Sequence, residues 1–326
     1  MKTITLGSSG IACEAVGLGT WAMGGWMWGG GDDAAAIKAI HASLDAGVSL
    51  IDTAPAYGLG RAERLVGEAL KGRREQAVIA TKCGLVWHTH EGTRFFEEDG
   101  YEVYRHLGRE SIFYEVEASL GRLKTDFIDL YITHWQDATT PVEETMAALL
   151  ELKQQGKIRA IGVSNVSAAT LVEYLKFGPV DAIQERYSLI DREIESELVP
   201  LCRQHGIAVL GYSSLAMGLL AGPIDPARQF TGDDQRATNP RFSAANRAAL
   251  QAFFDTIEPV RARLGCSFSQ LMIAWTIARG DVSVALCGAR TPLQAIENAG
   301  AGEVEVGSDE LALIDAAAKR HLGVLA

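Results

Sequence analysis

Apolar and polar positions follow one another along the chain in a repeating order. A short β-branched or apolar run ends in a polar or glycine-rich stretch, and an amphipathic segment follows it. Near-continuous apolar strands separated by helices are typical of a parallel sheet that is covered on both faces. The runs that predict strands lie at 16–19, 48–52, 77–82, 127–133, 158–164, 181–185, 207–212 and 282–287.

The amphipathic segments between these strands predict helices over 33–46, 61–71, 111–122 and 142–155. Eight strand–helix units fit a closed (β/α)8 barrel, and such barrels have roughly 200 to 400 residues. We therefore predict an α/β fold of the TIM-barrel type, with residues 1–326 as one domain. An open, doubly wound sheet is the alternative. The opening residues TITL and IACEA, split by GSSG, predict a β-hairpin outside the repeat.

Two connections are too long for plain turns. Residues 83–110 follow the third strand, and residues 213–242 follow the seventh. Long structureless loops in compact domains usually act as lids or binding loops. Both loops follow the C-terminal ends of strands, where the active sites of barrels lie, so we expect them to border the site.

Composition excludes several classes of function. The net charge of −11 argues against a nucleic acid or an anionic membrane as partner, since both attract basic surfaces. No run approaches the ~18 apolar residues of a transmembrane helix, and the N-terminus lacks the apolar core of a signal peptide. The five cysteines are odd in number and widely spaced, which indicates reduced thiols and a cytoplasmic protein.

Four residues with complementary chemistry lie at or just after three successive strand ends. Asp52, Lys82 and His134 follow the second, third and fourth strands, and Tyr57 lies five positions after Asp52. Because the strand ends of a barrel converge on one mouth, we expect these side chains to meet. Each of them alone also fits an ordinary role: a loop cap, a solvated strand end, a packed histidine or a loop tyrosine.

Together the four residues suit the protonation of an oxygen that gains negative charge as a hydride arrives. A tyrosine with an unperturbed pKa near ~10 is a weak acid, and a nearby ammonium lowers that pKa. A carboxylate paired with the ammonium holds it in place. A histidine can donate a hydrogen bond to a carbonyl oxygen.

The motifs around these residues resemble the aldo-keto reductase family along essentially the whole chain. The matching segments are GLGTWAMGG (17–25), IDTAPAYGLGRAERLVGEAL (51–70), ATKCG (80–84), SLGRLKTDFIDLYITHW (119–135), GKIRAIGVSN (156–165) and GARTPLQAIENA (288–299). The resemblance is greatest to the bacterial branch that acts on small aldehydes, methylglyoxal or sugar-derived carbonyls.

This resemblance implies NAD(P)H-dependent reduction of an aldehyde or ketone. The family's catalytic tetrad falls on Asp52, Tyr57, Lys82 and His134. In the implied roles, Tyr57 protonates the carbonyl oxygen, Lys82 lowers the tyrosine pKa, Asp52 holds Lys82 and His134 orients the substrate. GLGTWA also matches the dinucleotide motif G-x-G-x-x-G/A, but no helix is expected directly after it, which argues against a Rossmann unit.

The resemblance further implies a dinucleotide that lies extended across the barrel mouth. Ser164, Asn165 and Gln184 would bind the carboxamide, and Tyr212 would stack on the nicotinamide ring. The residues implied for the adenosine end are Gly288, Arg290, Gln294, Glu297 and Asn298. The other implied cofactor contacts are Gly19, Thr20, Trp21, Asp52, Ser213, Leu215 and Gly218. Ordinary alternatives are a helix N-cap for Ser164 or Asn165 and core packing for Tyr212.

Arg290 bears on the choice of cofactor. A guanidinium fits phosphate oxygens bidentately, so pairing of Arg290 with a 2′-phosphate would favour NADPH. A helix that begins near Pro292 would direct free N–H groups at a phosphate. The alternatives are an exposed surface arginine and use of NADH.

Five of the six tryptophans fall in predicted loops at the barrel mouth, which predicts an aromatic cleft. The expected substrate contacts are Trp21, Trp26, Tyr57, Trp87, His134 and Trp135. We expect Trp275 to lie in the core. No metal site is expected, because His88 and His90 lack an evident third ligand.

Two other functions fit parts of the sequence. A barrel glycosidase needs two carboxylates, and Asp52 and Glu185 could both face the mouth. A cofactor-sensing binding protein, like the channel-associated β subunits of the family, is the second alternative. We expect a monomer or a weak homo-oligomer.

Overall fold

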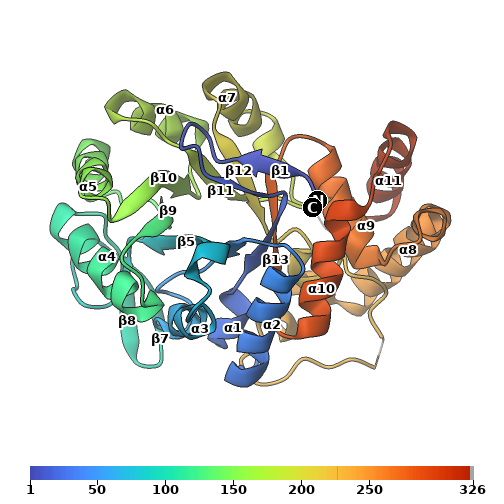
Figure 1. The fold of residues 1–326 in the computed structure, drawn as a ribbon. Coiled ribbons are helices and arrows are strands. Elements are labelled where there is room, and N and C mark those ends of the chain that lie inside the picture. Colours follow the sequence, from blue (N-terminus) through green and yellow to red (C-terminus); the bar gives the residue numbers. More distant parts are fainter. Residues whose placement is uncertain (226, 324–326) are drawn as a thin grey trace.

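The computed structural model describes residues 1–225 and 227–323, and its centre is a closed barrel of eight parallel strands (Figure 1). Neighbouring strands around the barrel follow one another in the sequence, so the predicted (β/α)8 fold is confirmed and the open sheet is wrong. The barrel strands are β3 (Val16–Gly19), β4 (Leu50–Asp52), β5 (Val78–Cys83), β9 (Ile128–Thr133), β10 (Ile158–Ser164), β11 (Ala182–Arg186), β12 (Ala208–Tyr212) and β13 (Val284–Gly288).

Helices form a ring outside the barrel (Figure 1). Several begin at a polar residue whose side chain accepts from a free backbone N–H, as Asp32 does for Ala35 and Ser267 for Gln270. The helices are α2 (Asp33–Asp45), α3 (Arg61–Ala69), α4 (Arg109–Leu123), α5 (Val142–Gln154), α6 (Ala168–Phe177), α7 (Leu198–His205), α8 (Ala244–Leu264), α9 (Phe268–Ala278), α10 (Pro292–Gly300) and α11 (Ser308–His321).

The predicted N-terminal hairpin, β1 (Thr3–Thr5) and β2 (Ala12–Glu14), is confirmed and closes one end of the barrel. Its buried side chains Leu6 and Ile11 pack against apolar residues that point into the barrel. The turn approaches the start of β11 so closely that a Cβ at Gly7 would lie 2.3 Å from the Asp181 carbonyl oxygen. The hairpin therefore leaves the C-terminal ends of the strands as the open mouth.

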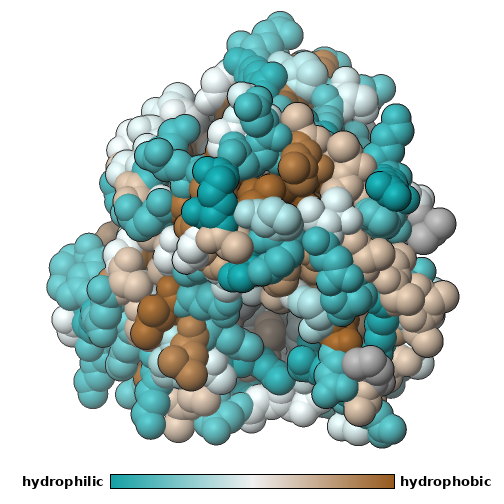
Figure 2. All heavy atoms as spheres, turned by 90° about the vertical axis from the view of Figure 1, so that its right-hand side faces the viewer, coloured by the Kyte–Doolittle hydropathy of each residue, from teal (hydrophilic) through white to brown (hydrophobic). Residues whose placement is uncertain are grey.

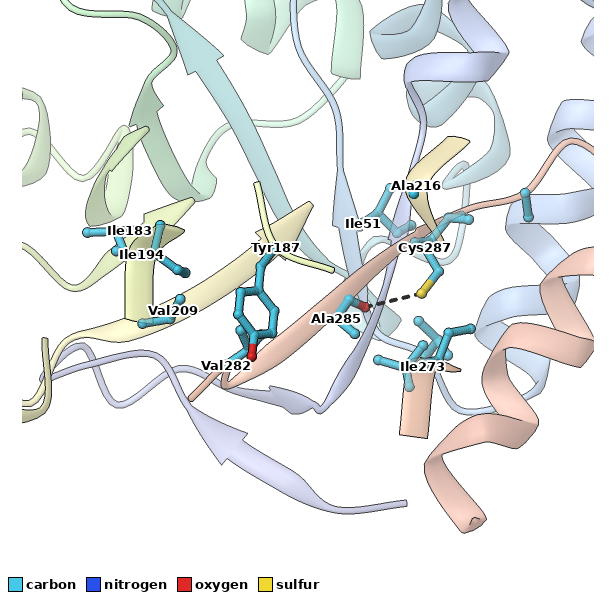
Figure 3. Close-up of a cluster of buried hydrophobic side chains, with 14 of the residues drawn as sticks. Ile51, Ile183, Tyr187, Ile194, Val209, Ala216, Ile273, Val282, Ala285 and Cys287 are labelled. Atoms are coloured by element: carbon cyan, nitrogen blue, oxygen red, sulfur yellow. Dashed lines mark hydrogen bonds between the residues drawn. The ribbon is translucent and has the colours of Figure 1, made fainter. Parts of the chain in front are cut away.

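A second, larger core lies between the barrel and the helices. Figure 3 shows part of it, where Ile183 and Val209 of the sheet lie near Ile194. Trp275 on α9 is fully buried in this core, as expected. Its indole Nε1 donates to Asp315 Oδ1 of α11 at 3.0 Å, which satisfies the one polar atom of the ring.

All five cysteines are buried free thiols, and burial raises the pKa of each of them. The pKa of Cys13, for example, rises to about 12. Because the thiolate is the reactive form, we expect the native protein to react only slowly with a disulfide reagent such as Ellman's. In denaturant all five thiols should react at once, and fast labelling of the native protein would contradict this packing.

The expectation of a structureless 83–110 loop is wrong. The segment contains β6 (Leu85–Val86), β7 (Thr93–Glu98) and β8 (Tyr101–Arg105), which form an antiparallel sheet. Asp99 and Gly100 both have positive φ, as the two central residues of a tight hairpin turn require. This Asp-Gly pair between two runs of alternating residues was the signal for a hairpin.

In the described residues of the 213–242 loop, 213–225 and 227–242, the only helical elements are short 3₁₀ turns: η3 (Ala216–Gly218), η4 (Gln235–Ala237) and η5 (Pro240–Phe242). After β3 the chain forms α1 (Trp21–Gly24), a single turn, where the sequence predicted no helix. Figure 2 shows that hydrophilic residues cover most of the side that carries α8 and α11. Within the described ranges, no helix is long and apolar enough to cross a membrane.

Candidate active site

A cavity of about 880 Å³ lies at the C-terminal ends of the barrel strands. Three of the predicted catalytic side chains meet at its inner end. The Lys82 ammonium lies 2.8 and 3.0 Å from the two carboxylate oxygens of Asp52, and it donates to the Thr53 carbonyl oxygen at 2.8 Å. It also donates to the Tyr57 hydroxyl at 3.1 Å. Lys82 is fully buried, whereas Asp52 and Tyr57 line the cavity.

The electrostatics of the phenol differ from the sequence expectation. Burial, followed by the charge of Asp52, raises the pKa of Tyr57 well above its usual value, where we expected Lys82 to lower it. The reason is that the Lys82 charge is balanced by Asp52, while the hydroxyl has lost its water. Tyr57 is therefore a protonated phenol at neutral pH, with its O–H available as a proton donor.

His134 completes the tetrad from the end of β9. Its ring stands edge-on to Tyr57, with the ring centroids 5.8 Å apart, and it lines the cavity. Burial and the Lys82 charge lower the pKa of His134 well below its usual value. The imidazole is therefore neutral and keeps one N–H to donate to a ligand. Its backbone carbonyl accepts from the Asn165 side chain at 2.9 Å.

The four residues expected around a nicotinamide ring form one network beside the tetrad. Asn165 accepts from the Tyr212 hydroxyl at 2.9 Å and donates to Ser164 Oγ at 3.1 Å. Gln184 Nε2 donates to Asp52 Oδ1 at 2.7 Å, a contact that the sequence did not reveal. Asp52 therefore accepts from Lys82 and Gln184 together, which links the residues expected around the nicotinamide ring, through Lys82, to the Tyr57 hydroxyl.

The residues expected at the adenosine end surround the first turn of α10, which Thr291 caps. Arg290 Nη1 donates to the carbonyl oxygens of Trp28 at 2.9 Å and Gly30 at 3.4 Å. Asn298 Nδ2 donates to the Gly288 carbonyl oxygen at 3.1 Å. At the start of this helix Pro292 has no N–H, and the Gln294 N–H donates to Thr291 Oγ1 at 3.3 Å.

A nicotinamide dinucleotide fits the residues that are present. Five arginines and three carboxylates are found among the described residues of the cavity wall, although the protein as a whole carries a net charge of −11. A Cβ at Gly218 would meet no atom within 4 Å, so this glycine leaves its part of the wall open. Aromatic side chains beside the tetrad and arginines elsewhere in the wall suit a flat ring joined to a pyrophosphate.

A model of the aldo/keto reductase family matches residues 15–319. The chain belongs to the aldo/keto reductase family. It is 42% identical over 320 residues to an NADH-specific methylglyoxal reductase of Escherichia coli K12, covering 96% of this chain and 97% of the relative. It is 41% identical over 297 residues to the aldo-keto reductase YhdN of Bacillus subtilis, covering 90% and 86% of the two chains.

Solved structures of aldo-keto reductases have the same fold. A glycerol dehydrogenase from Gluconobacter oxydans superposes with a TM-score of 0.88 at 37% identity, covering 98% of this chain and 96% of the other. An aldo-keto reductase from Klebsiella pneumoniae in complex with NADPH has a TM-score of 0.74 at 29% identity, with coverage of 97% and 95%. The chain is thus an oxidoreductase of a family that reduces carbonyl groups.

Most of the expected site residues of this aldo-keto reductase line the cavity. Those that do are Gly19, Trp21, Asp52, Tyr57, His134, Trp135, Ser164, Asn165, Gln184, Tyr212, Ser213, Leu215, Gly218, Gly288, Arg290, Gln294, Glu297 and Asn298. Glu185 is buried outside the wall and accepts from the Val166 backbone N–H. The Asp52–Glu185 pair that a glycosidase was expected to use is therefore not formed in the described cavity wall.

Three expected contacts are corrected. Thr20 is fully buried and donates to the Asp52 carbonyl oxygen, so its side chain does not reach the cavity. Trp26 stacks on Phe96 with a centroid distance of 4.8 Å. Trp87 packs in a small apolar cluster against the 83–110 sheet. Both rings stabilise loops because that sheet offers them an apolar surface.

Sequence reasoning missed several residues of the wall. Trp28 lines the cavity and stands edge-on to Trp21, with the ring centroids 5.5 Å apart. The arginines that it missed are Arg186, Arg228, Arg236 and Arg241. Three of these fall in the 213–242 loop, where their recurrence in an acidic chain was the available signal.

Proposed function

We propose that this aldo-keto reductase uses NAD(P)H to reduce a small aldehyde or a sugar-derived carbonyl to the alcohol, with Tyr57 as the proton donor. The observation that carries the proposal is the contact of the buried Lys82 ammonium with both Asp52 and the Tyr57 hydroxyl, beside the cavity. The bound cofactor supplies a hydride to the carbonyl carbon. The chain supplies the proton and the groups that hold the reactants.

The proton comes from the Tyr57 hydroxyl. As the carbonyl oxygen gains negative charge, Tyr57 donates its proton to it, and the Lys82 ammonium stabilises the phenolate that forms. Asp52 keeps Lys82 charged and fixed in a buried position that would otherwise disfavour the charge. The neutral His134 donates its remaining N–H to the same oxygen and so orients the carbonyl.

The substrate end of the cavity favours a compact, uncharged carbonyl. Trp21 stacks on Tyr57 with a centroid distance of 6.3 Å, and Trp135 follows His134 in the wall. These rings surround the phenol with aromatic surface that offers no charged partner to a substrate. One relative is named as a methylglyoxal reductase, and methylglyoxal is a small carbonyl compound, which supports a small substrate for this chain.

Oxidation of NADH and NADPH in the presence of methylglyoxal, glyceraldehyde and larger aldehydes tests this proposal. We expect turnover with the small carbonyls, falling as the substrate becomes bulkier. The purified chain needs no partner for this activity, unlike a cofactor-sensing binding protein. Absence of turnover with every aldehyde and both cofactors would contradict the proposed reaction.

Arg290 is proposed to select between the cofactors. Its Nη1 atom holds the backbone at Trp28 and Gly30, and its Nε and Nη2 atoms are the edge proposed to pair with a 2′-phosphate. We expect Arg290→Met to raise the Kd of NADPH by roughly ten- to hundred-fold, as for loss of a charged hydrogen bond, with little change for NADH. If Arg290→Met weakened the binding of NADH and NADPH equally, recognition of the 2′-phosphate by Arg290 would be contradicted.

A cytoplasmic location and a monomeric or weakly associated state complete the proposal. Five unpaired thiols are typical of a reducing compartment. Sedimentation at several protein concentrations measures the state of association.

A further inference from the structure

A turn after β10 positions the residues proposed to bind the nicotinamide ring. Asn165 has a φ of 55°, in the left-handed region that Asn tolerates better than most residues. In this conformation its side chain bonds three partners: the Tyr212 hydroxyl, Ser164 Oγ and the His134 carbonyl oxygen. Any change in the turn therefore moves several cavity groups together.

The carboxylate of Glu185 lies directly behind this turn. Glu185 Oε1 accepts from the Val166 backbone N–H at 2.9 Å, and the neighbouring Asn165 N–H donates to the Gln184 carbonyl oxygen at 3.4 Å. Glu185 is only 6% exposed and does not line the cavity. A buried carboxylate that accepts a backbone N–H directly after Asn165 fixes the path of the chain as it leaves the turn.

We propose that Glu185 is a positioning residue of the cofactor site: its carboxylate holds the Asn165 turn, so cofactor affinity depends on whether Glu185 is ionised. This inference rests on the proposed function, because it assumes that the nicotinamide ring lies against Asn165 and Tyr212. Glu185 itself touches neither cofactor nor substrate.

The surroundings of Glu185 make its ionisation sensitive to pH near neutrality. Burial raises the pKa of Glu185 to about 7, although the neighbouring backbone N–H groups act to lower it. The titratable groups that face it are Cys202 of α7 and Tyr212 of β12. Burial raises the pKa of both, to about 12 for Cys202, so both are neutral where Glu185 titrates.

The sign of the effect follows from the hydrogen bonds. Above pH 7 the ionised carboxylate accepts the Val166 N–H strongly and the turn is held. Below pH 7 the protonated acid is a weaker acceptor, and the turn relaxes. We expect the Kd of NADH and NADPH for the wild-type protein to rise about five-fold as the pH falls through this range, since charged hydrogen bonds are the stronger ones.

Fluorescence titrations with NADH and NADPH at a series of pH values around 7 test the inference. Glu185→Gln keeps one acceptor oxygen but cannot ionise. We expect its Kd at high pH to match the wild-type value at low pH, with no dependence on pH.

Glu98→Gln is the matched control. Burial and the charges of Asp99 and Asp233 raise the pKa of Glu98 to about 7 as well, but Glu98 ends β7 in the 83–110 sheet. We expect this variant to keep the wild-type dependence on pH. A wild-type Kd that does not change with pH, or a dependence that persists in Glu185→Gln, would overturn the inference alone. No binding at any pH would overturn the proposed function and this inference with it.

Discussion

Replacement of Tyr57 by Phe should abolish most of the reductase activity while leaving the cofactor bound. The hydroxyl is the only part of the side chain that is lost, and it is the atom that lies 3.1 Å from the Lys82 ammonium. Positioned general acids contribute roughly 10²- to 10⁴-fold to rates, so we expect kcat to fall by about that factor. The Kd of NADPH should change little, because the ring still packs beside Trp21.

The control for this variant is Tyr104→Phe. Tyr104 lies in β8, and its hydroxyl donates to Glu102 outside the cavity wall. Loss of this hydroxyl should leave kcat unchanged within experimental error. If Tyr57→Phe kept wild-type turnover, another group would have to supply the proton, and the role given to Tyr57 would be wrong.

Replacement of Lys82 by Met should remove activity and also destabilise the fold. Lys82 is fully buried, and its charge is the partner of the buried Asp52 carboxylate. Breaking a buried ion pair from one side leaves an uncompensated charge, which typically costs about 3–5 kcal/mol. We expect a loss of this order in the free energy of unfolding in urea, together with loss of turnover.

A double variant separates the two effects of Lys82. Asp52→Asn combined with Lys82→Met removes both charges, so it should recover part of the lost stability without recovering activity. If the double variant had the same low free energy of unfolding as Lys82→Met, lost packing and not the unpaired Asp52 carboxylate would cause the destabilisation.

The barrel and the tetrad were accessible from the sequence because both depend on local patterns. Each barrel strand is a short apolar run, and Asp52, Lys82 and His134 each lie at the end of one of these runs. Once the strands close into a ring, their C-terminal ends meet without further information. The position of Tyr57 follows from its short distance along the chain from Asp52.

Other features depend on how loops pack and could not be predicted in the same way. The 83–110 segment forms its own sheet, which takes Trp26 and Trp87 into its packing and away from the substrate. The raised pKa of Tyr57 results from burial and from the charge of Asp52. The bond from Gln184 to Asp52 joins residues 132 positions apart in the sequence.

The most direct test of the account is a titration of the purified protein with NADPH and with NADH, followed by quenching of tryptophan fluorescence. Trp21 and Trp28 lie in the cavity wall, so a bound nicotinamide should quench them. We expect saturable binding of at least one cofactor, with one dinucleotide per chain. No binding of either cofactor would contradict it, because Lys82 and Tyr57 would then have no hydride donor beside them.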